Sequence, residues 1–117
     1  RKKMAIGKSS AQNYTVVEAQ NIALGQTGAA YTDTTDAYTP PSGSVIVAIT
    51  MLTDVEFATL TPESTSFHYG TTAAAPGTNG ATVANSDTFP KGVTIYGRWL
   101  NLTLQTGGDK VVIYFAP

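Results

Sequence analysis

The segment from Phe89 to Pro117 predicts two strands, a tight turn and a third strand, with apolar and polar residues alternating on either side of the turn. Gly107 and Gly108 interrupt the alternation and are typical of the two-residue turn that joins the strands of a hairpin. With this turn, three apolar pairs face each other on one side of the predicted hairpin: Leu104 with Val111, Leu102 with Ile113, and Leu100 with Phe115. A shift of one residue would break every pair, so the pattern predicts the register as well as the strands.

The opposite side of this predicted hairpin has a mixed character. It carries Trp99, Asn101, Thr103, Val112, Tyr114 and Ala116. Such a set is too apolar for a fully solvated face and too polar for a dry core. Because Trp, Tyr and Arg are enriched in protein interfaces, we expect a subunit or partner contact here. The residues expected to form it are Tyr96, Arg98, Trp99, Val112 and Tyr114. An aromatic platform that stacks on sugars or bases is the alternative interpretation.

Three further segments have the pattern of strands. Val45 to Leu52 is apolar on both faces, as in strands that are covered on both sides. Residues 54–60 alternate, and Tyr14 to Ala19 is rich in β-branched residues. The stretches 26–43 and 70–88 are rich in Thr, Gly, Asp, Asn and Pro, which predicts long connections. No stretch has a helical period over three turns.

These elements predict an all-β protein, with an antiparallel β-sandwich of two packed sheets as its fold. The pattern does not decide between a jelly-roll and an immunoglobulin-like topology. We expect one sandwich domain over residues 14–117, preceded by an extended basic arm over residues 1–13. Tyr31 and Tyr38 are expected to anchor the first long connection.

Composition adds the chemical character of this domain. The chain has 117 residues, 13% of them charged, and 19 are threonine, a residue that suits half-buried pleated surfaces. There is no cysteine, which excludes disulfides and thiolate metal sites.

Four cations, Arg1, Lys2, Lys3 and Lys8, lie in the first eight residues, whereas the chain as a whole has a net charge of −1. We therefore expect the arm to dock on an acidic protein surface. Four cations without a second basic stripe do not predict nucleic-acid binding.

Residues for catalysis or metal binding are sparse. His68 is the one histidine, and its position between two aromatic residues favours a structural or surface role. Asp54 and Glu56 project to the same face of a strand, which suits either a carboxylate pair in a glycosidase or, more commonly, a charged strand edge. We predict no catalytic residues, no metal site and no cofactor. No apolar run reaches the ~20 residues that cross a membrane, so no membrane partner is expected.

A family resemblance lies in the segment Phe89-Pro90-Lys91-Gly92-Val93-Thr94-Ile95-Tyr96-Gly97-Arg98-Trp99, followed by alternating leucines, a Gly-Gly turn and a Tyr-Phe ending. This pattern resembles small structural proteins of tailed bacteriophages, and among them the capsid decoration, or cement, proteins. The resemblance implies a non-enzymatic virion protein on the exterior of the capsid. Such a protein binds between subunits of the major capsid protein and stabilises the head. The resemblance also implies a homo-oligomer, with a trimer favoured and a dimer possible.

Phage fibre, baseplate and receptor-binding proteins carry related β-hairpin endings. A carbohydrate-binding or adhesin-like β-sandwich module is therefore the second hypothesis. A small hydrolase ranks below both, because the sequence has no nucleophile elbow around a serine.

Overall fold

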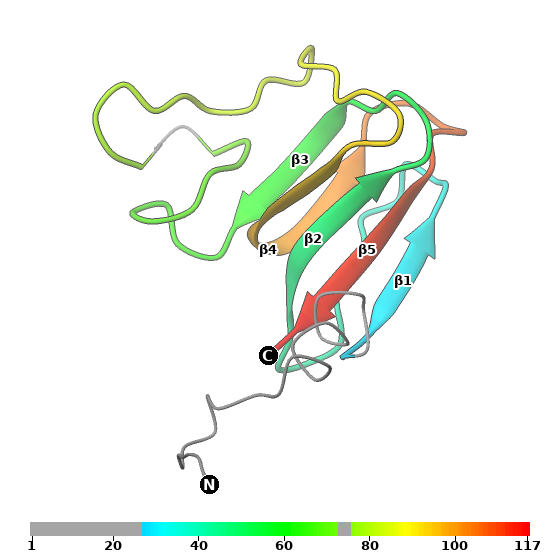
Figure 1. Ribbon diagram of the computed structural model, residues 1–117, viewed down its shortest axis with the longest axis horizontal. Coiled ribbons are helices and arrows are strands. Elements are labelled where there is room, and N and C mark those ends of the chain that lie inside the picture. Colours follow the sequence, from blue (N-terminus) through cyan, green and yellow to red (C-terminus); the bar gives the residue numbers. More distant parts are fainter. Residues whose placement is uncertain (1–26, 73–75) are drawn as a thin grey trace, which may run out of the picture.

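The computed structural model describes residues 27–72 and 76–117 of the chain (Figure 1). These residues form five strands and no helix: β1 (Ala29–Thr32), β2 (Val45–Met51), β3 (Phe57–Pro62), β4 (Thr94–Leu104) and β5 (Val111–Ala116). In this part of the chain there is accordingly no helix long and apolar enough to cross a membrane. The predicted arm, residues 1–13, and the strand predicted at residues 14–19 lie outside the described residues.

The five strands form one antiparallel sheet in the order β1-β5-β2-β4-β3 (Figure 1). The prediction of an all-β, antiparallel protein is confirmed. The division into two separate sheets is not confirmed, because the described strands belong to a single sheet. The sandwich and its topology therefore stay predictions.

Strand β4 bends sharply, and this bend folds the sheet over. The beginning of β4 and the beginning of β5 both lie at the Met51 end of β2, whereas Trp99 of β4 pairs with Ile46 near the other end. A straight strand of 11 residues would carry Leu104 about 34 Å away from that starting point. The connection from Leu104 to Val111 reaches at most about 25 Å. The second half of β4 must therefore turn back, and there it pairs with β3.

The predicted hairpin is wrong in its pairing. β2 lies between β4 and β5, so Leu104 does not pair with Val111, which pairs with Met51 instead. Gly107 and Gly108 are the two central residues of a tight turn, as predicted, because Asp109 N donates to Thr106 O at 3.4 Å. This turn belongs to a longer connection, however, and does not join two paired strands. Backbone hydrogen bonds hold this connection to neighbouring loops: Gln105 N donates to Glu56 O at 3.0 Å and Gly108 N to Asp33 O at 3.3 Å.

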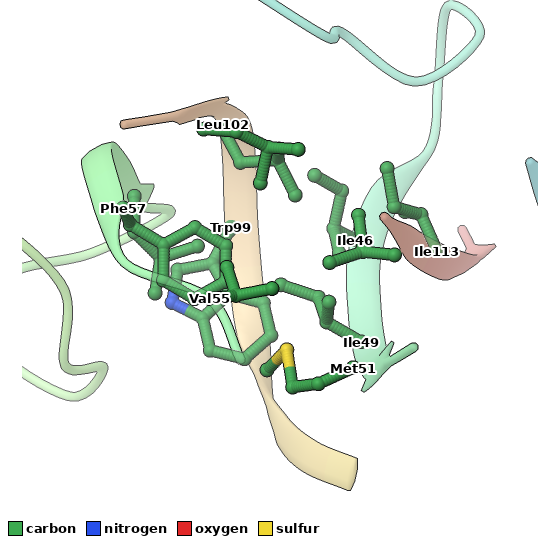
Figure 2. Packing of buried hydrophobic residues seen from close by; sticks show 11 residues of the cluster. Ile46, Ile49, Met51, Val55, Phe57, Trp99, Leu102 and Ile113 are labelled. Atoms are coloured by element: carbon green, nitrogen blue, oxygen red, sulfur yellow. The ribbon is translucent and has the colours of Figure 1, made fainter. Parts of the chain in front are cut away.

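The core fills the space inside the folded sheet (Figure 2). Its buried members come from four strands and from the loop before β3, and they are Ile46, Ile49, Met51, Val55, Phe57, Leu60, Trp99, Leu102, Leu104, Val111 and Ile113. Four partly buried side chains pack against them: Tyr38, Tyr69, Phe89 and Ile95. The predicted anchoring role of Tyr38 is confirmed, because its backbone also pairs with Leu102. Tyr31 is not an anchor; it lies in β1 and is 54% exposed.

Bulges explain why Trp99 and Leu100 exchange the places that simple alternation predicts. Leu100 is the extra residue where β3 pairs with β4, since Thr61 pairs with Asn101 and Pro62 with Trp99. A bulge shifts the alternation by one residue and bends the strand. Trp99 consequently lies in the core at 0% exposure, whereas Leu100 is 43% exposed. Leu102 and Leu104 are buried, as predicted.

Candidate functional site

One outer face of the sheet carries three tyrosines among small and uncharged residues. We call it the tyrosine face and define it by Tyr31, Thr50, Thr94, Tyr96, Val112 and Tyr114. The register gives two rows across four strands. The first row is Thr94, Thr50, Val112 and Tyr31, and the second row is Tyr96, Ala48, Tyr114 and Ala29. Because successive residues of a strand point to opposite faces, both rows lie on the face opposite the core residues Ile49 and Ile113.

The tyrosine face is uncharged and partly solvent-exposed. Tyr96 is 70% exposed, whereas Val112 and Tyr114 are half-buried. The Thr50 and Thr94 hydroxyls share a hydrogen bond of 2.8 Å across β2 and β4, which fixes both side chains. A surface of this kind offers area and hydrogen-bonding hydroxyls to a partner.

The structure brings together three of the five residues that were predicted to form a contact. Tyr96, Val112 and Tyr114 lie on the tyrosine face. Trp99 does not, because its indole is buried in the core, where its Nε1 donates to the Tyr69 carbonyl at 2.9 Å. The sequence analysis missed Tyr31, since a run of four strand residues was too short to stand out within a Thr- and Gly-rich stretch.

Arg98, the fifth predicted contact residue, is engaged within the chain. Its Nε donates to Glu63 Oε1 at 2.6 Å and its Nη2 donates to Oε2 at 3.4 Å. This fork-shaped ion pair holds the pKa of Glu63 below its ordinary value and raises the pKa of Arg98. The pair attaches the start of the loop after β3 to β4, assisted by a backbone hydrogen bond from Glu63 N to Arg98 O. Its observed role is therefore structural.

A second attachment of this loop runs through Tyr69. The Tyr69 hydroxyl donates to the Tyr96 carbonyl at 2.7 Å, and its ring packs edge-on against Trp99 with ring centres 5.4 Å apart. Burial raises the pKa of the Tyr69 phenol. The loop thereby holds the backbone beneath Tyr96, which is the most exposed tyrosine of the described residues.

The candidate catalytic groups have structural partners. Asp54 Oδ1 accepts a hydrogen bond from Lys91 N at 2.8 Å, and Glu56 Oε2 accepts one from the Thr88 hydroxyl at 2.7 Å. Both carboxylates thus hold the loop that leads into β4. His68 Nε2 lies 3.8 Å from Glu63 Oε1, at the edge of the Arg98 ion pair. Residues 27–72 and 76–117 contain no cluster of potential metal ligands and enclose no pocket.

The predicted arm residues Arg1, Lys2, Lys3 and Lys8 lie outside the described residues, so docking of the arm stays a prediction. Comparisons with protein families, curated proteins and solved structures found no match to this chain.

Proposed function

We propose that this protein is a structural virion component, a capsid decoration protein that binds the outer surface of a phage head between major capsid protein subunits and stabilises it. The observation that carries the proposal is the tyrosine face: an uncharged surface with three tyrosines, held on a hydrogen-bonded sheet. Aromatic side chains on rigid strands lose little conformational entropy on binding, so they suit a permanent contact.

Burial of apolar area explains how such a contact stabilises a shell. Each 100 Å² of apolar surface removed from water contributes about 2.5 kcal/mol. When a protein bridges two shell subunits, the subunits can separate only if the buried apolar area is exposed to water again. Separation therefore costs this free energy. Many copies on one shell multiply the effect, because each bound copy holds its neighbours in place.

The proposed partner is the major capsid protein, and the proposed location is the exterior of the virion. The basic arm supplies a second contact, since Arg1, Lys2, Lys3 and Lys8 give it a charge of +4 over eight residues. Charge attraction of this kind acts over about 8–10 Å at physiological salt and raises the rate of encounter with an acidic surface. The sheet face then provides the lasting contact.

Occupancy measurements on empty shells test the role of the tyrosine face. We expect the double variant Tyr96→Ala/Tyr114→Ala to bind shells at least tenfold more weakly than the unchanged protein. The matched control is Phe67→Ala, because Phe67 is 78% exposed but lies in the loop after β3, outside the tyrosine face. Equal loss in both variants, or no loss in either, would reject the tyrosine face as the contact.

A carbohydrate-binding module is the second candidate function. Tyr96 and Tyr114 flank the small residue Ala48 in one row, an arrangement on which an extended sugar chain can stack. Trp99 is excluded from this platform by its burial. Glycan-array binding that is lost in Tyr96→Ala and kept in Phe67→Ala would favour this function over the first.

A further inference from the structure

The two edge strands of the sheet, β3 and β1, differ in whether other residues cover their outer backbone groups. On the β3 edge, Leu60 N donates to the Thr71 hydroxyl and Thr71 N donates to Leu60 O, both at 2.9 Å. A Cβ on Gly70 would overlap Leu60 O, so the loop lies directly against the strand. Pro62 ends β3 and has no N–H to offer. These contacts close the β3 edge to any further strand.

Among residues 27–72 and 76–117, none protects the β1 edge in this way. Phe115 N donates to Gly28 O at 3.0 Å, which identifies these two residues as a hydrogen-bonded pair. By the alternation of an antiparallel ladder, Ala30 and Thr32 then bond to β5, while the N–H and C=O groups of Ala29 and Tyr31 point outward. The strand contains no charge, no proline and no bulge, the usual devices that block edge pairing. No described residue pairs with this outer edge.

We propose that β1 pairs in antiparallel fashion with β1 of a second copy of this chain, about a twofold axis at Ala30. This register places Ala29 opposite Tyr31 of the partner subunit, and Tyr31 opposite the partner's Ala29. Every outward N–H and C=O group of Ala29 and Tyr31 in both copies is then paired, which gives four hydrogen bonds. The two sheets become one continuous sheet.

Side-chain sizes favour this occupant over an unrelated strand. In the second row of the tyrosine face, large and small residues alternate as Tyr96, Ala48, Tyr114 and Ala29. The proposed register continues the alternation with the partner's Tyr31, whose ring lies beside the small Ala29. On the other face the partner's Ala30 meets Ala30, so no bulky group holds the strands apart. Large beside small is the pattern by which cross-strand neighbours pack well.

The proposed pairing goes beyond the proposed function and does not depend on it, since it concerns the free protein. It extends the tyrosine face across both copies, which would give a shell contact of twice the area. A contact through one short strand is smaller than a standard interface, so we expect a dissociation constant in the micromolar to millimolar range. A twofold axis also favours a dimer over the trimer that the family resemblance implies.

A single-cysteine variant tests the register directly, because the chain has no other cysteine. In Ala30→Cys, the two sulfur-bearing residues would be a non-hydrogen-bonded pair with Cα atoms about 4.5 Å apart, within the range of about 4.4–6.8 Å for disulfides. We expect mild oxidation to convert most of this full-length variant to a covalent dimer. Thr59→Cys, on the closed β3 edge, is the matched control and should stay monomeric. No dimer from Ala30→Cys, or equal dimer from both variants, would overturn the proposal.

Sedimentation equilibrium of the full-length protein provides the second test. We expect the mass to rise with concentration from 12.2 kDa to twice that value. Tyr31→Pro removes an outward N–H that has no partner within the sheet, so it should remain folded by circular dichroism and weaken dimerisation at least tenfold. Tyr31→Phe keeps the backbone groups and should dimerise normally. A wild-type protein that is monomeric up to about 1 mM, or that forms trimers, would overturn the proposal.

Discussion

At the scale of single residues, Trp99 is the side chain whose role the structure changes most. Its ring lies over Gly97, where a Cβ would approach the ring within 2.6 Å, and its N–H is satisfied by the Tyr69 carbonyl. A buried tryptophan with a satisfied donor is a core residue rather than a surface anchor. Tyr96, only three positions earlier, takes the outward role. The difference between these two aromatic residues follows from the bulges of β4 and not from residue type.

Replacing Trp99 should therefore affect stability far more than adhesion. We expect Trp99→Ala to lower the free energy of unfolding by about 3–5 kcal/mol, since it removes the largest buried side chain and leaves the Tyr69 carbonyl without its donor. The measurement is urea unfolding followed by circular dichroism, because Trp99 is the only tryptophan. Tyr96→Ala, at an exposed position, should change stability by less than about 0.5 kcal/mol. Similar losses in the two variants would contradict the assignment.

The Glu63–Arg98 ion pair predicts a small acid dependence of stability. The hydrogen bond from Arg98 lowers the pKa of Glu63, so this pair stabilises the fold above the ordinary glutamate pKa of about 4.3. The contribution is lost as the pH falls through the lowered, folded-state value. We expect wild type to be more stable than Glu63→Gln at neutral pH, and the difference to shrink at about pH 3. A difference that grows toward acid would contradict this sign.

At the scale of the elements, alternation predicted which residues share a face but not which strands are neighbours. Leu102, Leu104, Val111 and Ile113 are all buried, as the pattern of the last two strands required. Alternation contains no information about strand order, so the insertion of β2 between β4 and β5 was not predictable. The positions of bulges, and hence the exchange of Trp99 and Leu100, were not predictable either, because a bulge depends on the partner strand.

The closure of the β3 edge depends on a residue without a side chain at position 70. We expect Gly70→Ala to destabilise the protein by about 1–3 kcal/mol, because the new Cβ would overlap the Leu60 carbonyl and force the loop away. Gly107→Ala is the control, since no atom lies within 4 Å of a Cβ built there. Thermal unfolding compares the two variants. An equally stable Gly70→Ala would show that the loop adapts without cost.

At the scale of the whole molecule, the chain combines one antiparallel sheet, an uncharged tyrosine face and a basic segment in its first eight residues. The long loop after β3 extends beyond that edge of the sheet, while β1 lies at the opposite edge (Figure 1). In the proposed arrangement, the tyrosine face contacts the shell, β1 contacts a second copy and the arm contacts an acidic surface. The tyrosine face uses side chains that project from the sheet, whereas β1 pairs through its backbone edge, so all three contacts can form together.

Removal of residues 1–8 should show how much of the binding to shells comes from the charge of the arm and how much comes from the sheet. We expect the shortened protein to bind shells more weakly at low salt, and its binding to depend less on salt concentration, because four cations are missing. Pelleting of shells with labelled protein over a salt series measures both effects. Unchanged occupancy at every salt concentration would reject a docking role for the arm.

We propose that this protein acts by adhesion and strengthens a loaded shell. The most direct measurement is genome retention by particles that lack the protein, on heating and in low salt, before and after the purified protein is added back. We expect the deficient particles to release DNA at a lower temperature and the added protein to restore retention, whereas the Tyr96→Ala/Tyr114→Ala variant should not restore it. Particles that retain their genome equally well with and without the protein would contradict this proposal.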